Sequence, residues 1–236
     1  YHRIKCERGD DLVVDIFGAD HISTVQEVIA GVGALGSDAT KIKVVLHQMV
    51  SFLKDGQPYK LSKRNGEQYT LDDLIQDLSA DVVRYFFLMR SADTQLVFDI
   101  NLAMEQSDKN PVFYLQYAHA RLCSLFANAA DQGIPLPSVD NVMRACNVVH
   151  PTERELVKIC DKFPSVVLRA TTGLEPHIVA DYLREVAAAF HSFYHECRIL
   201  GESDEVRSSR LYLALMARQV LHNGLKVLGV NAPRKM

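Results

Sequence analysis

The chain has 236 residues, of which 48% are hydrophobic and 23% charged, and its formal net charge is −3. Its five cysteines are odd in number and form no CxxC pair, which argues against a disulfide framework, and no apolar run is long enough to cross a membrane. We therefore expect an ordinary globular protein of the cytoplasm, neither exported nor bound to a membrane.

The first elements predict a βαβ unit. Residues 12–18 are apolar and β-branched and end at Gly18, which is typical of a strand buried on both faces of a parallel sheet. Residues 21–35 have apolar side chains at a period near 3.6, which predicts a helix, and residues 42–46 form the next candidate strand. This order favours part of an open α/β sheet.

From Leu71 onward strand patterns nearly vanish, and the rest of the chain is expected to be a helical bundle. Asn110-Pro111 marks a helix start, and residues 133–138 form the strongest loop signal. We place the domain boundary near residue 108. Helices are predicted at about 71–78, 80–90, 101–108, 110–130, 152–161, 164–173, 176–199 and 206–228.

A basic loop lies between these two parts. Residues 60–66, Lys-Leu-Ser-Lys-Arg-Asn-Gly, follow a turn at residues 55–58 and precede the helix at Leu71. Lys60 and Lys63 can place two ammonium groups on a polyphosphate, with the Ser62 hydroxyl beside them, provided the loop closes on its substrate. From composition alone, a solvated surface turn is the favoured interpretation, because such basic strings are common on protein surfaces.

Several segments resemble bacterial arginyl-tRNA synthetases in order and spacing. The resemblance covers essentially the whole chain, and the loop matches the second signature of class I synthetases, with Leu61 in place of the usual Met. The matching segments are residues 18–21, 60–66, 85–91, 105–107, 110–121, 190–194 and 218–225.

The resemblance implies a mixed, mainly α fold. Residues 1–108 would be the C-terminal part of a Rossmann-type α/β catalytic domain, and residues 109–236 an all-α bundle that binds the anticodon. It further implies an arginine–tRNA ligase whose substrates are L-arginine, ATP with Mg²⁺, and arginine tRNA. Neither DNA nor a membrane would be a partner, and the full-length form would be a monomer.

The resemblance also assigns catalytic-side residues. Gly18, Asp20 and His21 match the strand-end motif that lines the pocket for ATP and arginine, although Asp20 can equally cap the following helix. Ile22 stands where many relatives have a second His. Lys60, Ser62 and Lys63 match the mobile loop.

In the bundle, the family pattern places anticodon contacts on the first long helix, on the penultimate helix and at the C-terminus. The matching residues are Tyr114, Tyr117, Arg121, Tyr194, Arg198 and Met236. The first three share one helix face, and stacking on Tyr with pairing by Arg is a common way to hold unstacked nucleotides. Core packing is the alternative for each Tyr. Residues 110–236 carry 14 cations against 12 acids, an excess too weak to decide.

The His-x-Gly-His signature of class I synthetases is absent from this sequence. In relatives it precedes the residue that matches Tyr1, so we interpret the chain as a truncated form and expect no aminoacylation by it alone. Two alternatives stay open: a standalone tRNA-binding module without catalysis, and a related synthetase for another amino acid. His191, His195 and Cys197 suggest zinc only weakly, because no second pair of ligands follows; we expect no metal site.

Overall fold

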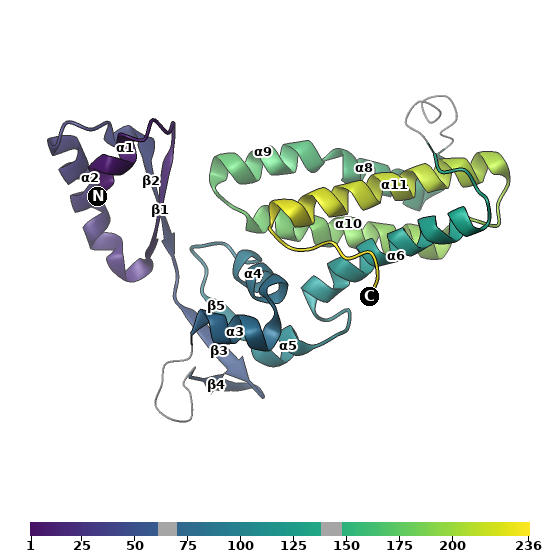
Figure 1. Cartoon of the computed structure of the whole chain (residues 1–236), viewed down its shortest axis with the longest axis horizontal. Helices are drawn as coiled ribbons and strands as arrows, with labels where there is room; N and C mark the ends of the chain where they lie inside the picture. The colour runs from purple at the N-terminus through teal and green to yellow at the C-terminus, as the bar shows by residue number, and fades with distance from the viewer. Residues whose placement is uncertain (61–69, 138–147) are drawn as a thin grey trace. The chain divides into compact units, whose positions relative to one another are not determined.

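The computed structural model describes residues 1–60, 70–137 and 148–236, and this part of the chain is mainly helical (Figure 1). It divides into two compact units. The first holds residues 1–60 with 90–99, and the second holds residues 70–89 with the described residues from 100 to 236. Ser62 and Lys63 of the basic loop lie outside the described residues. The boundary expected near residue 108 remains a prediction.

The first unit begins with the predicted βαβ arrangement. Strand β1 (Val13–Gly18) pairs in parallel with β2 (Ile42–His47), in the register Val13 to Ile42. The connection between them holds the short 3-10 turn η1 (Ala19–His21), helix α2 (Ile22–Ala34) and a second turn, η2 (Ala39–Lys41). Val13, Val32 and Ile42 form a small buried cluster between strands and helix. The prediction of parallel strands joined by a helix is thus confirmed.

The expectation that this strand is buried on both faces is wrong for the described chain. Side chains alternate between the faces of a strand, and only the face toward α2 is covered. On the other face, Val14 is 39% exposed and Ile16 70% exposed. The face toward the helices also holds the buried carboxylate of Asp15, which forms an ion pair with Lys5 and lies 3.0 Å from His2 Nε2. Both residues belong to α1 (His2–Cys6), a short helix that the sequence did not predict.

A second sheet of the first unit has the order β4-β3-β5. β3 (Val50–Lys54) and β4 (Gln57–Tyr59) form an antiparallel hairpin around Asp55 and Gly56, whose φ angles of 54° and 71° suit a tight two-residue turn. β5 (Leu96–Asp99) lies parallel to β3. The expectation that strands end before Leu71 is therefore wrong at β5. That strand has four residues, too few to give a clear alternation in the sequence.

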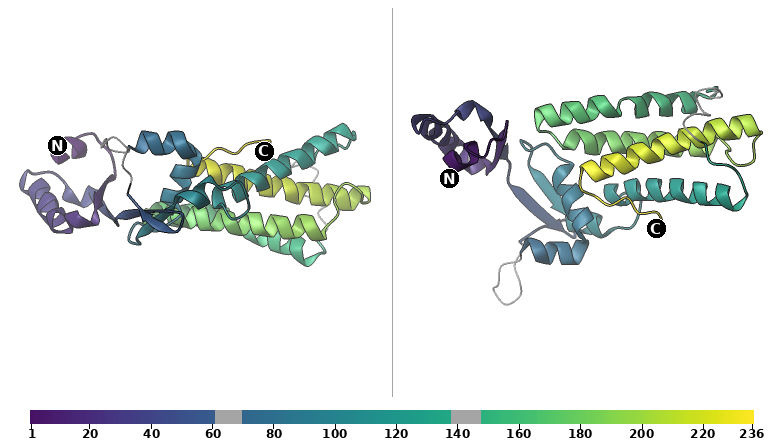
Figure 2. Two further views of the ribbon diagram at one scale, coloured as in Figure 1. Left: turned by 90° about the horizontal axis from the view of Figure 1, so that it is seen from below. Right: turned by 45° about the horizontal axis from the view of Figure 1, so that its top comes forward.

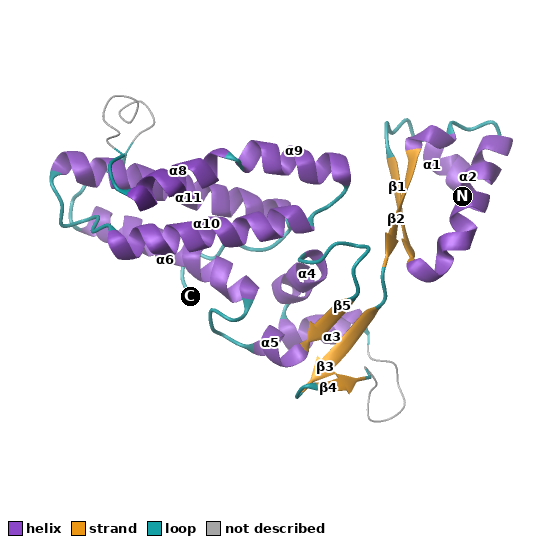
Figure 3. Cartoon of the chain, turned by 180° about the vertical axis from the view of Figure 1, so that it is seen from behind, coloured by secondary structure: helices purple, strands orange, loops and turns teal. Residues whose placement is uncertain are grey.

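The second unit is helical, as Figure 3 shows by its purple ribbons. Every helix expected there is present, although the one expected at 101–108 ends at Met104. The start of α6 was predicted correctly: Asn110 caps it by accepting a hydrogen bond from the Val112 amide, with Pro111 in the first turn. The helices are α3 (Leu71–Leu78), α4 (Ala80–Leu88), α5 (Ile100–Met104), α6 (Pro111–Asp131), α8 (Pro151–Asp161), α9 (Phe163–Gly173), α10 (His177–Glu196) and α11 (Asp204–Val227).

Helix α10 is the centre of the bundle, because α6, α8, α9 and α11 all pack against it (Figures 1 and 2). Leu183 and Phe190 of α10 are fully buried. The α10–α11 contact is close: a Cβ atom built on Gly224 would lie 2.4 Å from a methyl carbon of Leu183. The Tyr85 hydroxyl of α4 donates a hydrogen bond to the Ala180 carbonyl of α10 at 3.3 Å. Packing of α6 against α10 brings together the two helices that carry Tyr114, Tyr117, Arg121 and Tyr194.

Candidate functional site

An open groove of about 730 Å³ lies along α6 and α10. It combines four of the six residues that the sequence analysis assigned to anticodon binding: Tyr114, Tyr117, Arg121 and Tyr194. The first three are three and four residues apart, so the helical repeat places them on one face of α6, while Tyr194 comes from the last turns of α10. Asp108, His191, Ser192, His195 and Glu196 complete the lining.

Arg121 links the two walls of the groove. Its guanidinium carbon lies 4.3 Å from the centre of the Tyr194 ring and 6.0 Å from that of Tyr117. Both distances are typical of a cation held against an aromatic face. Within the described chain, the guanidinium makes no hydrogen bond or ion pair. It is therefore a cation positioned by aromatic rings with its donors still available to a ligand.

His191 lies on the same wall and was not among the residues predicted to bind RNA. Its ring centre is 5.1 Å from that of Tyr114 and 6.2 Å from that of Tyr117, and it stacks on the latter at an interplanar angle of 25°. Phe190 contacts the ring from its own helix. Partial burial, together with the charge of Arg121, lowers the pKa of His191 below its ordinary value. The imidazole is thus mainly neutral at pH 7.

The alternative that the tyrosines are only core residues does not describe the observed groove. Tyr117 is 43% exposed, whereas Tyr114 is half-buried and burial raises its pKa. Tyr114 packs against His191, and Tyr117 packs against Phe113 with nearly parallel rings. The two tyrosines are therefore supported from within the bundle while they also line the groove.

Arg198, the fifth predicted residue, lines a separate hollow of about 450 Å³. Its guanidinium lies over Gly201, so close that a Cβ atom there would be 2.2 Å from Nε. Asn128 of α6 and Gln132, the residue that follows α6, line the same hollow, and Tyr194 borders both this hollow and the groove. Tyr194 therefore lies between an aromatic groove and a hollow of mixed polar and apolar lining.

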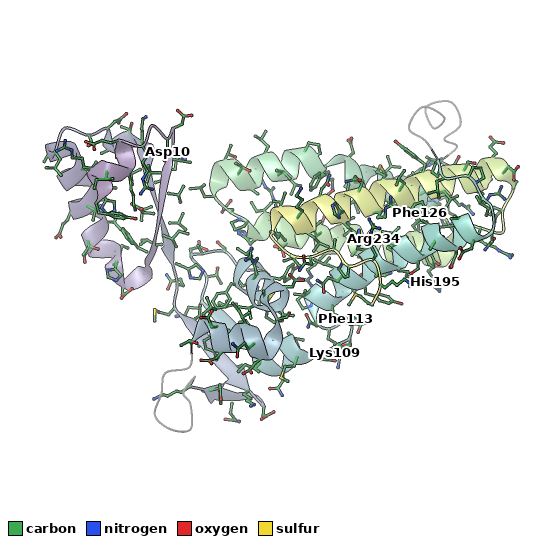
Figure 4. The ribbon with its side chains drawn as sticks, in the orientation of Figure 1. Asp10, Lys109, Phe113, Phe126, His195 and Arg234 are labelled. Carbon is green, nitrogen blue, oxygen red and sulfur yellow. The ribbon has the colours of Figure 1, made fainter. Side chains whose placement is uncertain are left out.

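Met236, the sixth, ends a tail that returns to α6. Asn231 bonds to the Asp81 carboxylate of α4 through its amide and backbone N–H groups, and its carbonyl accepts a hydrogen bond from Gln116 at 3.0 Å. A ring nitrogen of His119 lies 2.8 Å from the Pro233 carbonyl. Figure 4 shows Arg234 on this tail beside α6. Met236 is 56% exposed and does not line the groove or the hollow at Arg198.

The residues expected on the ATP side belong to the first unit. Gly18 ends β1, and Asp20 and His21 form the turn after it. Both side chains are exposed, and His21 Nε2 lies 3.7 Å from the Asp20 carboxylate. A Cβ atom at Gly18 would lie 2.4 Å from Asp20 Oδ1, so the turn requires a glycine there or a displaced Asp20. Asp20 is not the cap of α2, since the residue at that position is His21.

Histidine and cysteine side chains are spread out in the part of the chain that the structure describes, where no three groups of His, Cys, Asp or Glu are placed to hold a metal ion. His195 lies beside Glu196 at 3.1 Å, while His191 faces aromatic rings. Lys60, the described lysine of the loop, is exposed after β4. Among the helices described, none is long and apolar enough to span a membrane.

Comparison with known proteins places this chain in a known family. A family model described as the DALR anticodon binding domain matches residues 115–236, more than half of the chain. The chain belongs to that family. The matched part begins within α6 and runs to Met236, so it contains α10 and most of the residues that line the groove.

The curated relatives extend the match to the whole chain. Arginine–tRNA ligases from Salinibacter ruber and Geobacter metallireducens are each 48% identical to it, and each alignment covers all of this chain. The chain spans 42% of the length of either relative. It corresponds to the C-terminal portion of arginyl-tRNA synthetases.

Two solved structures have a fold similar to that of this chain. A Campylobacter jejuni protein provisionally named an arginyl-tRNA synthetase has a TM-score of 0.87 and 31% identity, and the match covers all of this chain and 50% of that one. The arginyl-tRNA synthetase of Thermus thermophilus has a TM-score of 0.72 and 21% identity over 96% of this chain and 41% of that one, which supports the fold alone.

Proposed function

We propose that this chain is the tRNA-binding and ATP-loop portion of an arginine–tRNA ligase, and that the groove on α6 and α10 holds nucleotides of the arginine anticodon. The observation that carries the proposal is the position of Arg121 against the rings of Tyr117 and Tyr194, with no hydrogen-bond or ion-pair partner for its guanidinium among the described residues. Aromatic faces stack on unpaired bases, and guanidinium donors pair with phosphate or base edges. The family match over residues 115–236 supports the same reading.

The genetic code indicates which anticodon base the groove should recognise. Every arginine codon has G in the middle, so every arginine anticodon has a central C. A groove that selects arginine tRNA therefore gains most by reading that base. Tyr194, Arg198 and Met236 remain proposed contacts of the anticodon loop, with Tyr194 at the border between two compartments that would hold neighbouring nucleotides.

The catalytic side of the proposal rests on the first unit. Gly18, Asp20 and His21 follow the carboxyl end of β1 in a parallel βαβ arrangement, which is where Rossmann-type α/β domains bind ligands. We propose that they line the pocket for L-arginine and ATP, the latter as its Mg²⁺ complex. Lys60, Ser62 and Lys63 would stabilise the charge on the leaving pyrophosphate. Asp20 and His21 are exposed and contact each other, so both are available to a substrate.

We further propose that this chain alone does not aminoacylate tRNA, because its sequence has no His-x-Gly-His motif. We expect the cytoplasm as its compartment and a monomer as the state of the full-length form. ATP–pyrophosphate exchange with arginine and added tRNA is the test: detectable exchange by this chain would contradict the proposed inactivity.

A standalone tRNA-binding module is the second candidate, since the groove needs no catalytic domain to bind RNA. The loop with Lys60 after β4 argues against it, because a binding protein has no use for a phosphate-binding loop beside a βαβ unit. Adding this chain to an N-terminal synthetase fragment that carries His-x-Gly-His separates the two. Restored exchange, lost again in Lys60→Ala, supports the ligase; no restoration supports the module.

The binding proposal is tested by titrating the chain, at fixed low salt, against arginine tRNA and the same tRNA with its central anticodon C replaced by U. We expect at least tenfold weaker binding of the altered tRNA, about 1.4 kcal/mol. Tyr194→Ala should bring the two affinities together. Equal binding of both tRNAs by the unaltered chain, falling steeply with salt, would mean only nonspecific phosphate contact.

A further inference from the structure

We propose that His191 is a specificity residue of the groove, and that its unprotonated ring nitrogen accepts a hydrogen bond from the exocyclic amine of a cytosine. The inference rests on the proposed function and deepens it, because it names a base edge and the group that reads it. Nothing in the resemblance or the family match assigns a role to this residue.

The first step is the placement of the ring. His191 lines the groove, stacks on Tyr117 and packs against Tyr114 and Phe190. These contacts restrict the imidazole on its faces. Its edge carries both nitrogens, and within the described residues neither nitrogen has a hydrogen-bond partner.

The second step is that packing alone does not explain a histidine here. A phenylalanine would fill the same space against three aromatic rings, with no polar atom to satisfy. A half-buried imidazole without a protein partner loses part of its hydration, which costs free energy unless water or a ligand replaces it. The groove is open, so a ligand can approach the ring edge.

The third step is the donor and acceptor pattern around the ring. Arg121 presents only donors, and a neutral imidazole offers one acceptor nitrogen. A cytosine edge has two acceptors, O2 and N3, and one donor, the amine on C4. Arg121 opposite the acceptors and His191 opposite the amine would complement that edge. Uracil places a carbonyl oxygen where the amine stands and an N–H group at N3, so His191 would have to change its tautomer to bond with it, and the N3–H would face the donors of Arg121.

Other groups in the groove also carry charge or titrate. Asp108 could accept from the same amine, and Glu196 is already close to His195. The titratable and charged groups that line the groove together with His191, from α6, α10 and the segment before α6, are Asp108, Tyr114, Tyr117, Arg121, Tyr194, His195 and Glu196. Asp108 is the direct rival for the role of acceptor and is therefore included in the test.

The experiment measures the ratio of affinities of the whole 236-residue chain for arginine tRNA with central C and with central U, at fixed salt and pH 7.5. His191→Phe keeps the aromatic packing and removes the acceptor, whereas His191→Gln restores an acceptor oxygen. We expect His191→Phe to weaken binding of the C form at least fivefold and the U form less than twofold. His191→Gln should retain most of the preference.

The control is His177→Phe, at the first residue of the same helix and away from the groove, which should leave the ratio unchanged. Thermal unfolding of each variant checks that the bundle is intact. An unchanged ratio in His191→Phe, or a ratio lost in Asp108→Asn but kept in His191→Phe, overturns the inference while the proposed function stands. No preference in the unaltered chain overturns both.

Discussion

The Arg121 guanidinium of α6 lies 4.3 Å from the ring centre of Tyr194, a residue 73 positions further along the chain on α10. This contact joins the two helices at the point where the groove meets the hollow at Arg198. It also has a clear energetic meaning, because a cation against an aromatic face contributes about 0.5–2 kcal/mol. The contact therefore orients both side chains before any RNA arrives.

Two substitutions at Arg121 distinguish the effect of its positive charge from that of its planar guanidinium group. Arg121→Ala should weaken arginine tRNA binding by tenfold or more, since it removes the donors and the support of Tyr194. Arg121→Lys should recover only part of this loss, because an ammonium lacks the planar fork of a guanidinium. Filter-binding titrations over a range of salt check this. Arg169→Ala, an exposed arginine of α9, is the matched control; an equal loss in both variants would show that net charge alone matters.

Acidification should reduce the selectivity of the groove. The pKa of His191 lies below its ordinary value because of burial and the Arg121 charge, so the neutral acceptor persists at neutral pH and is lost as the pH falls through that lowered pKa. We expect the C-to-U affinity ratio to be constant from pH 8 to about 6.5 and to decline below. Because both tRNAs make the same phosphate contacts, the effect of pH on those contacts cancels in the C-to-U affinity ratio. A ratio that is equally pH-dependent in His191→Gln would contradict this assignment.

The buried pair of Glu153 and Arg210 should stabilise the bundle. Arg210 Nε donates to the Glu153 carboxylate at 2.7 Å, and the amides of Val149 and His150 donate to its other oxygen. Glu153→Gln should lower the free energy of unfolding by roughly 2 to 4 kcal/mol, because it removes the buried charge partner of Arg210 and leaves only Glu202, 3.5 Å from Nη1. Urea unfolding measures it, with Glu155→Gln, exposed on the same helix, as control. Equal free energies of unfolding for the two variants would contradict a stabilising role of the Glu153–Arg210 pair.

The same pair predicts a pH dependence of stability. Burial opposes ionisation of Glu153, but the hydrogen bonds from Arg210, His150 and Val149 outweigh it and hold the pKa below its ordinary value. A lowered folded-state pKa contributes stability above the unfolded-state value of about 4.3, and that contribution disappears as the pH falls below it. The unaltered chain should therefore lose more stability than Glu153→Gln between pH 5.5 and 3.5. Parallel curves for the two proteins would contradict the assigned shift.

The close approach of α10 and α11 makes Gly224 sensitive to any side chain. Gly224→Ala would place a methyl group 2.4 Å from Leu183, and we expect a loss of about 1–3 kcal/mol by overpacking. Gly31→Ala, on α2 with nothing within 4 Å, should instead stabilise its helix by about 0.5–1 kcal/mol. Thermal unfolding of both variants tests the contrast, and a stabilised Gly224→Ala would show that Leu183 moves away freely.

The sequence predicted long helices well because their caps and periodicity are local. Asn110 before Pro111 is one example, since the cap and the first turn lie within three residues. β5 was missed because its four residues become a strand only by pairing with β3, whose partner residues lie 46 positions earlier in the chain. The residues of the groove show the same contrast between local and long-range determinants. Spacing alone placed Tyr114, Tyr117 and Arg121 on one face, whereas the contact of His191 with two tyrosines of another helix depends on packing between α6 and α10.

The contact between Asp81 and Asn231 has a consequence for synthesis of the protein. The two residues are 150 positions apart, and the Asp81 carboxylate accepts from both the backbone and side-chain N–H groups of Asn231. At about 5–20 residues per second, a ribosome needs roughly 8 to 30 s to add the residues between them. During that interval, Asp81 of α4 cannot bond to Asn231. The tail contacts of Asn231 with α4 and α6 therefore form only after both helices have been synthesised.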